Sequence, residues 1–290
     1  MELAKTLQAS QALHENTVGL VGRELAFILD HRIRLIVGDI PPLCFEIAAR
    51  AAIPSVAITN FTWNCIYRAY LGQYPDFAPL IEEMELFYGK TTIALTLPYS
   101  CDMNVFPRRE TIPWIARTSS LTKKEARAKF ELPESAIIVL LSFGGLGFHS
   151  LPLNRLKRLR EFFFVTTGES KKRDANLLVL PDAQRQYEDL VRAVDIILTK
   201  PGYGIVTDAL VHQVPMLYTD RGEFPEYPLL VQALKDLATA EFIPQKELLS
   251  GHIAPYLNRL LTNEPSWRRI PLDGARIAAE KIIALIDHHV

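Results

Sequence analysis

The feature that most constrains the fold is an alternation of short apolar runs with turns and helical stretches, which begins near Ile33 and continues almost to the end of the chain. Runs such as Ser55–Thr59 and Ala136–Ser142 have the length and the apolar composition of strands buried on both faces. Gly, Pro or Asp turns follow such runs, and helical patterns come next. This order predicts α/β architecture, with βα units around parallel, doubly wound sheets.

The periodicity also places individual elements. In the first half it predicts a helix within residues 1–30, strand Ile33–Val37, a helix opened by Pro42 that buries Phe45, Ile47 and Ala48, strand Ser55–Thr59, a loop and helix within residues 60–90, and strand Ile93–Leu97. In the second half it predicts strands 136–142, 162–166, 177–180, 195–199, 215–218 and 238–242, and helices 152–159, 184–193, 203–212, 226–236, 245–262 and 273–287.

A domain boundary is expected after residue 133. The segment Arg117–Lys129 is polar and basic, and Leu132-Pro133-Glu134 comes just before the strongest predicted strand. The chain is therefore divided into an N-terminal domain over residues 1–133, a C-terminal domain over residues 134–270, and a helix in residues 271–290 that is expected to pack back on the N-terminal domain.

Composition excludes several classes of protein. Among 290 residues, 32 Lys plus Arg face 33 Asp plus Glu, so nothing indicates a nucleic-acid-binding surface. No apolar run approaches the roughly 18 residues that a membrane span needs, and residues 1–30 do not have the pattern of a secretion signal. The three cysteines show no CxxC spacing, and the histidines have no partners at metal-ligand spacing. We expect a cytoplasmic protein with no membrane span, no metal and no cofactor.

Two glycine-bearing turns are candidate anion sites. Ser142–Gly147, with Gly144 and Gly145, follows a predicted strand and precedes a helix. Glycines in such a turn let backbone N–H groups approach a phosphate. The spacing matches neither GxGxxG nor the phosphate loop, so a tight strand-to-helix connection explains this motif equally well.

The second turn is Thr199–Gly204, with Lys200, Gly202 and Gly204. Both turns end strands of one predicted sheet, where open α/β sheets bind ligands, so their pairing favours a phosphate-bearing ligand. Asp208 lies one helical turn further on, and Arg221 and Glu223 follow in a charged loop. The alternative role for Asp208 is an acid in the first turn of a helix, which the helix dipole favours. The alternative for Arg221 and Glu223 is a solvated ion pair in the loop.

Together these residues resemble a known family. The resemblance to the nucleotide-sugar-binding half of GT-B glycosyltransferases is carried by Val194–Gly204, Asp208-Ala209-Leu210, Pro215–Tyr218 and Arg221–Tyr227. In the first half, Val37–Pro42, Ile53–Ala57 and Asn60–Trp63 are similar to the glycosyltransferase-like region fused to plant arabinokinase. The bacterial peptidoglycan N-acetylglucosaminyltransferase is a more distant likeness. The resemblance implies two Rossmann-like domains.

The resemblance also implies roles for residues. Gly144, Gly145, Gly202 and Gly204 would line the diphosphate of a sugar donor, with Lys200 near its charge. Arg221 in the charged loop is expected to add a local positive charge for a bound anion. Asp208 stands where related transferases carry a Glu that binds the nucleotide ribose. Glu226 and its neighbours, including Glu223, match a loop that meets the donor sugar. The implied ligand is a nucleoside diphosphate sugar, with uridine as the expected base.

One part of the family pattern is not matched. GT-B folds begin with a strand and a Gly/His-rich loop, and residues 1–32 contain neither, so the N-terminal domain is expected to be incomplete. For inverting sugar transfer, which needs a general base, Asp39 after the first strand is the best-placed candidate, and its alternative role is a helix cap. His149, beside the first glycine turn, is a second candidate for the chemistry, and its alternative is a surface histidine.

Three functions are compatible with these observations. The first is a hexosyltransferase of the GT-B type that binds a nucleotide sugar in an interdomain cleft and transfers the sugar to an unknown acceptor. The second is a non-catalytic nucleotide-sugar-binding or regulatory module, and the third is a nucleotide-sugar epimerase. The sequence also leaves a homodimer open.

Overall fold

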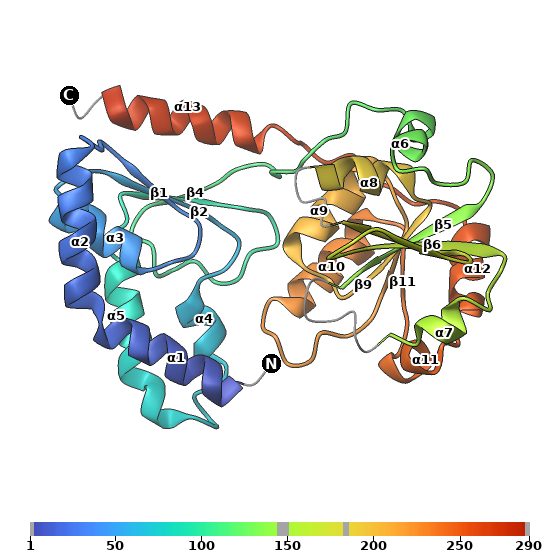
Figure 1. The fold of residues 1–290 in the computed structure, drawn as a ribbon. Helices are drawn as coiled ribbons and strands as arrows, with labels where there is room; N and C mark the ends of the chain where they lie inside the picture. Colours follow the sequence, from blue (N-terminus) through green and yellow to red (C-terminus); the bar gives the residue numbers. More distant parts are fainter. Residues whose placement is uncertain (1–2, 144–150, 182–185, 288–290) are drawn as a thin grey trace. The chain divides into compact units, whose positions relative to one another are not determined.

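The computed structural model describes residues 3–143, 151–181 and 186–287 (Figure 1). The chain forms two compact units. Unit 1 comprises residues 1–115, 224–229 and 273–290, and unit 2 comprises residues 116–223 and 230–272. Each unit is described by itself.

Unit 1 is built on a four-stranded parallel sheet. Its strands are β1 (Ile36–Gly38), β2 (Ser55–Thr59), β3 (Ile93–Thr96) and β4 (Arg109–Thr111), in that spatial order. Gly38 pairs with Ala57, and Thr59 pairs with Thr96. The sheet is parallel because each connection returns the chain to the same edge through helices or a long loop.

Helices cover this sheet. Figure 1 shows α1 (Leu3–Glu15), α2 (Thr17–Asp30), α3 (Leu43–Arg50) and α5 (Ala78–Tyr88) together on one side of it. Two shorter elements, α4 (Trp63–Arg68) and the 3₁₀ helix η1 (Pro75–Phe77), lie between β2 and α5 in the chain. The last helix, α13 (Gly274–Asp287), also belongs to this unit, and its Lys281 pairs with Glu110 in β4.

The core of unit 1 is aromatic. Phe45, Tyr88 and Phe106 are at most 1% exposed and contact one another with ring centroids 5.4–6.3 Å apart. Burying three such rings removes several hundred Å² of apolar surface from water, which stabilises the sheet–helix interface by several kcal/mol.

Unit 2 is built on a seven-stranded sheet. Its spatial order is β11-β10-β9-β5-β6-β8-β7, and all pairs are parallel except β7 with β8. The strands are β5 (Ile137–Ser142), β6 (Phe162–Gly168), β7 (Lys172–Asp174), β8 (Leu177–Pro181), β9 (Ile196–Thr199), β10 (Met216–Tyr218) and β11 (Ala240–Phe242).

Helices lie on both faces of this sheet, as the doubly wound pattern predicts. Alternate residues of β5, β6 and β9, such as Leu141, Phe164 and Leu198, form one core cluster with α7 (Leu153–Leu156), α11 (Gln245–Ser250) and α12 (Ala254–Thr262). The strand residues between them are also buried, which is the signature of a sheet covered on both sides. Among the described residues, this unit also contains α6 (Lys123–Lys129), α8 (Tyr187–Ala193), α9 (Tyr203–His212) and, from Leu230 onward, α10 (Tyr227–Leu237).

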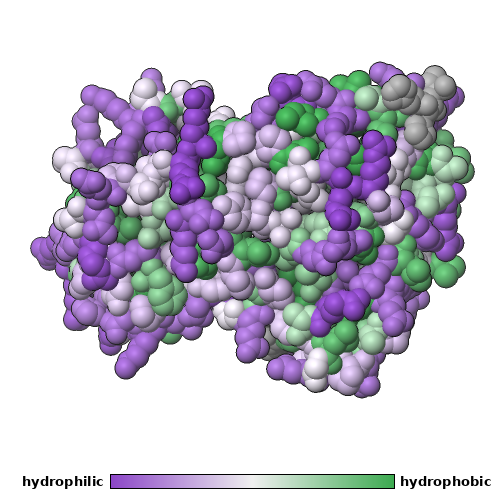
Figure 2. All heavy atoms as spheres, turned by 180° about the vertical axis from the view of Figure 1, so that it is seen from behind, coloured by the Kyte–Doolittle hydropathy of each residue, from purple (hydrophilic) through white to green (hydrophobic). Residues whose placement is uncertain are grey.

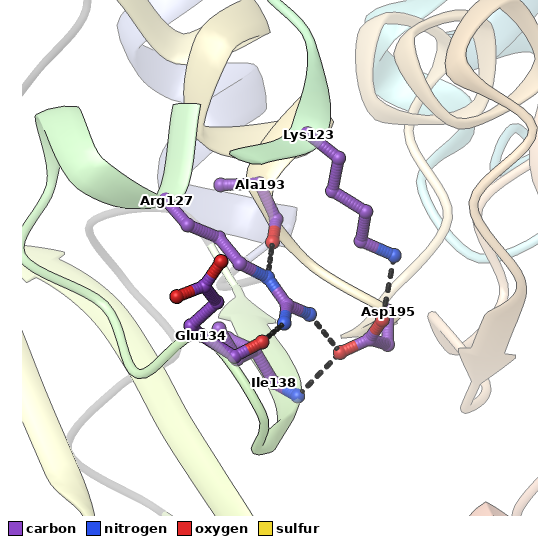
Figure 3. A network of polar contacts seen from close by, with 6 residues as sticks. All are labelled: Lys123, Arg127, Glu134, Ile138, Ala193 and Asp195. Carbon is purple, nitrogen blue, oxygen red and sulfur yellow. Dashed lines mark hydrogen bonds and ion pairs between the residues drawn. The ribbon is translucent and has the colours of Figure 1, made fainter. Parts of the chain in front are cut away.

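A polar network joins α6 to the strands of unit 2 (Figure 3). The Asp195 carboxylate accepts hydrogen bonds from Ile138 N at 2.7 Å, Arg127 Nη2 at 2.6 Å and Lys123 Nζ at 2.5 Å. Arg127 Nε also donates to Ala193 O at 3.0 Å. These bonds connect α6 to the starts of β5 and β9. The compact units divide after Ile115, so that α6 lies in unit 2, whereas the polar composition around Arg117–Lys129 predicts a boundary after residue 133.

Several element predictions need correction. The helix expected in residues 1–30 is two helices, and the first strand begins at Ile36 rather than Ile33. The helix expected over residues 245–262 is interrupted at Gly251, which has φ 76° and ends α11 in the left-handed conformation. Strands β4 and β7 and helix α6 were not predicted, because they are short and largely exposed and so show no apolar period.

Hydrophobic side chains appear as separate areas between hydrophilic ones on the face drawn in Figure 2. Among the described residues, no helix combines the length and apolar character that crossing a membrane requires.

Candidate functional site

The turn between β9 and α9 is the centre of the candidate site in unit 2. β9 ends at Thr199, and Gly202 is the N-cap of the ten-residue helix α9, with φ −132°, ψ 155° and no side-chain cap. The first helical bond runs from Val206 N to Gly202 O, so the amides of Gly204 and Ile205 lack an acceptor within the helix. Such N–H groups, together with the helix dipole, favour an anion.

A guanidinium lies directly beside this turn. Arg221 Nη1 donates to Pro201 O at 3.1 Å, and a Cβ built on Gly202 would lie 4.0 Å from the same nitrogen. The Lys200 side chain is exposed at the preceding position. The turn therefore carries Gly202, Gly204 and the exposed Lys200, with Arg221 bonded beside it, and their donor-binding roles stay predictions.

The neighbouring strand ends add polar groups. β5 and β10 flank β9, so that Ser142 and Tyr218 both pair with Thr199. Thr199 Oγ1 donates to Ser142 O, and Thr219 N donates to Thr199 O at 3.0 Å. Thr219 is fully buried, and its Oγ1 has no hydrogen-bond partner among the described residues. Sequence reasoning missed Thr219, although its position directly after β10 marks it as a residue of this sheet edge.

Asp208 lies on α9, four residues after Gly204, and its side chain is 2% exposed. Its Oδ2 accepts a hydrogen bond from Arg117 Nη2 at 2.5 Å. Burial raises the pKa of Asp208, and the Arg117 bond opposes that rise. No pattern in the sequence indicates this partner, which is 91 residues away in the chain. The ribose role of Asp208 stays a prediction, and the carboxylate would have to accept the ribose hydroxyls while it holds Arg117.

The two acids of the 221–227 loop belong to different units. Glu223 is exposed in unit 2, whereas Glu226 is 2% exposed in unit 1 and accepts a hydrogen bond from Asn60 Nδ2 at 2.6 Å. Phe224 contacts Phe61 in the same unit, with ring centroids 6.2 Å apart. Asn60 is thus the hydrogen-bond partner of Glu226, and the sequence alone could not show this pairing.

Asp39 is an exposed residue of unit 1 in the turn between β1 and α3. It does not cap α3, because the N-cap is Pro42 and no side chain bonds there. The next residue, Ile40, has φ 77°, a conformation that a β-branched residue rarely adopts, and Tyr88 Oη donates to its carbonyl. Partial burial raises the pKa of Asp39, in the direction that suits a general base.

The first glycine turn falls outside the described residues. Gly144, Gly145 and His149 lie in the segment 144–150, so their predicted roles stay predictions. Among the described residues, no group of three or more His, Cys, Asp or Glu side chains is arranged to hold a metal ion.

Comparison with solved structures identifies the architecture. The chain superimposes on the glycotransferase of kitacinnamycin with a TM-score of 0.62 at 15% identity, over 100% of this chain and 80% of that one. The spinosyn rhamnosyltransferase SpnG in complex with spinosyn aglycone gives 0.60 at 14% identity, over 100% and 79%. MurG of Acinetobacter baumannii gives 0.51 at 16% identity, over 85% and 70%. The chain has the GT-B glycosyltransferase fold.

Sequence comparison adds one relative. L-arabinokinase of Arabidopsis thaliana is 29% identical over 252 residues, which are 84% of this chain. The chain spans 24% of the length of that kinase. No family model matches the chain. The GT-B resemblance expected from the sequence is confirmed, including its arabinokinase branch.

Proposed function

We propose that the chain is a glycosyltransferase that binds a nucleoside diphosphate sugar in unit 2, at the carboxyl ends of β5, β9 and β10. The observation that supports this most is the position of Arg221 beside the uncapped first turn of α9. In open α/β sheets, ligands bind outside the carboxyl ends of the strands, at such turns.

Sugar transfer needs groups that stabilise negative charge, and the β9–α9 turn contains such groups. As the bond from the anomeric carbon to the diphosphate breaks, negative charge develops on the leaving group. N–H donors at Gly204 and Ile205 and the cations of Arg221 and Lys200 would stabilise that charge without rearranging. Asp208 would orient the ribose through its hydroxyls, and the family pattern gives Glu223 and Glu226 contacts with the sugar. Gly144 and Gly145 would also line the diphosphate of the bound nucleotide sugar.

The acceptor hydroxyl must also lose a proton. In the proposed reaction, an inverting transfer of a hexosyl group, Asp39 is the general base and His149 assists at the leaving group. A carboxyl whose pKa is raised by partial burial accepts a proton more readily than an ordinary Asp. Asp39→Asn should therefore lower kcat for transfer and leave donor affinity unchanged, as measured with a radiolabelled donor. Unchanged kcat would remove Asp39 from the mechanism.

Calorimetry with UDP tests the donor site. Arg221→Met should weaken UDP binding about tenfold or more, because a charge-assisted bond to phosphate contributes roughly 1.5–3 kcal/mol. The matched control is Lys246→Met, which removes an exposed cation from α11 in the same unit and should not change binding. No binding of UDP to the unaltered chain, or equal loss in both variants, would contradict the proposal.

A second candidate function is supported by the relative. The chain is similar to about a quarter of a longer kinase, so the same fold could serve as a nucleotide-sugar-binding module without transfer. The two candidates differ in one measurement, the release of UDP from a UDP-sugar by the purified chain. Release, with or without an added acceptor, favours the enzyme, and binding without release favours the module.

A further inference from the structure

Two cysteines of unit 1 lie next to each other, although they are far apart in the chain. Cys65 is in α4, which Figure 1 labels, and Cys101 is in the segment that follows β3. The Cys101 thiol donates a hydrogen bond to the sulfur of Cys65. Both thiols are free. A disulfide needs two sulfur atoms that can meet, and these two are already neighbours.

The surrounding contacts hold the two cysteines in this arrangement. The Cys101 amide donates to Asn60 O at 2.9 Å, and the Asp102 amide donates to the Cys65 sulfur. Cys101 belongs to the aromatic core cluster of unit 1, and Cys65 packs against the same cluster. The sulfur of Cys65 therefore accepts hydrogen bonds from two consecutive residues, whose backbone is tied to the end of β2.

The two cysteines differ in their access to solvent. Cys65 is half-buried and lines an open hollow between α4 and α5. Cys101 is only 9% exposed. A small oxidant can therefore reach Cys65 from solution, while Cys101 is placed to react afterwards with an oxidised Cys65. A solvent-accessible cysteine beside a second, resolving cysteine is the usual arrangement of a redox-sensitive pair.

The local chemistry favours Cys65 as the residue that reacts first. The hydrogen bond from Cys101 lowers the pKa of Cys65 to about 7 against the opposing effect of burial, and Arg68 lowers it further. The Asp102 carboxylate acts in the other direction. Burial raises the pKa of Cys44 to about 12, and the bond to Cys65 followed by burial raises the pKa of Cys101. Peroxides oxidise the thiolate form, so Cys65 should be oxidised before the other two cysteines.

We propose that Cys65 and Cys101 form a reversible disulfide when the chain meets a hydroperoxide. The Cys65 thiolate attacks one peroxide oxygen, the O–O bond breaks, and the leaving oxygen takes a proton to become water or an alcohol. Cys65 is then a sulfenic acid, and the Cys101 sulfur attacks the sulfur of Cys65. The S–O bond breaks, water leaves with the proton of Cys101, and the S–S bond forms. The peroxide accepts the two electrons that the two thiols lose, and a dithiol reductant returns them.

The disulfide would also change the stability of unit 1. It would close a loop that contains η1, α5 and β3. A cross-link restricts the unfolded chain more than the folded one, so the oxidised unit should unfold at a higher denaturant concentration than the reduced unit. The cysteine pair lies in unit 1, and the inference does not rest on donor binding by unit 2.

Peptide mass spectrometry of the full chain tests the pairing. Trypsin leaves Cys44, Cys65 and Cys101 on separate peptides, residues 35–50, 51–68 and 91–108. The reduced chain is treated with hydrogen peroxide near pH 7, the remaining thiols are blocked with iodoacetamide, and the digest is analysed without reduction. We expect a cross-link between peptides 51–68 and 91–108 that dithiothreitol removes. Absence of this cross-link, or a cross-link to peptide 35–50 instead, would overturn the proposal.

Cysteine variants separate the two steps. Cys101→Ala should leave Cys65 as a sulfenic acid that dimedone labels, and Cys65→Ser should protect Cys101 from oxidation. The matched control is Cys44→Ser, because serine can keep the bond that Cys44 donates to Pro41 O, and this variant should form the disulfide at an unchanged rate.

The unaltered chain gives a second test if Cys101→Ala does not fold. Dimedone added together with peroxide should label Cys65 at least about tenfold faster than Cys44, and should reduce the yield of the cross-link. Equal labelling of the two cysteines, or unchanged oxidation of Cys101 in folded Cys65→Ser, would contradict the proposal.

Discussion

Gly204 offers a test that separates ligand binding from protein stability. It is the second residue of α9, its φ is not in the left-handed region, and no atom lies within 4 Å of a Cβ built on it. Nothing in the backbone therefore requires glycine here. Since Gly in a helix costs roughly 0.5–1 kcal/mol relative to Ala, Gly204→Ala should stabilise unit 2 by up to about 1 kcal/mol. For a unit of this size the thermal midpoint should rise by roughly 1–4 °C.

The same substitution should impair donor binding. The added methyl group stands next to the amides that would approach the diphosphate, so the loss of one such bond should weaken UDP binding about tenfold. Gly22→Ala is the matched control, because Gly22 lies in α2 of unit 1 and also has no atom within 4 Å of its Cβ position. It should stabilise the chain without changing UDP affinity. If Gly204→Ala binds UDP like the unaltered chain, the α9 amides do not hold the diphosphate. If the variant is less stable, the backbone at this position does require glycine.

Three further predictions concern the stability of the two units, each measured by denaturant unfolding. Gly274→Ala should destabilise unit 1 by about 1–3 kcal/mol, because its Cβ would lie 2.1 Å from Pro113 O; an unaltered unfolding curve would contradict that close approach. Burial alone would raise the pKa of Glu46, but hydrogen bonds from two cations bring it below its usual value of 4.5, so Glu46 contributes stability above that pH. Glu46→Gln should therefore lower the free energy of unfolding by about 1–3 kcal/mol at pH 7. The difference between the variant and the unaltered chain should shrink as pH falls through the folded pKa of Glu46. A difference that stays constant with pH would contradict a lowered pKa. For Asp208 the sign is opposite, because burial raises its pKa above 3.8. The unaltered chain should therefore lose stability relative to Asp208→Asn as pH rises from 3.8 through the folded pKa. A gain in stability over that pH range would show that the Arg117 bond outweighs burial.

The sequence was most informative where burial was complete on both faces of a strand. Ser55–Thr59 and the helix Tyr203–His212 were predicted with the boundaries that the structure shows, since a proline or glycine marks the start of each. Short exposed strands such as β7, whose three residues are all exposed, carry no apolar pattern that a sequence analysis could detect.

Part of the site could be predicted for the same local reason. Lys200, Gly202 and Gly204 lie within one turn, so their proximity follows from chain connectivity. The partners of Asp208 and Glu226 could not be predicted, because Arg117 and Asn60 are 91 and 166 residues away. Such pairs depend on how the units pack internally. No period or motif in the sequence encodes them.

A crystal structure of the full chain with bound UDP would locate the donor site directly. We expect the diphosphate at the β9–α9 turn, with its oxygens within hydrogen-bond distance of the Gly204 amide and the Arg221 guanidinium. Diphosphate bound elsewhere in the chain, with Arg221 still on the Pro201 carbonyl and the α9 amides facing solvent, would contradict the proposed donor site.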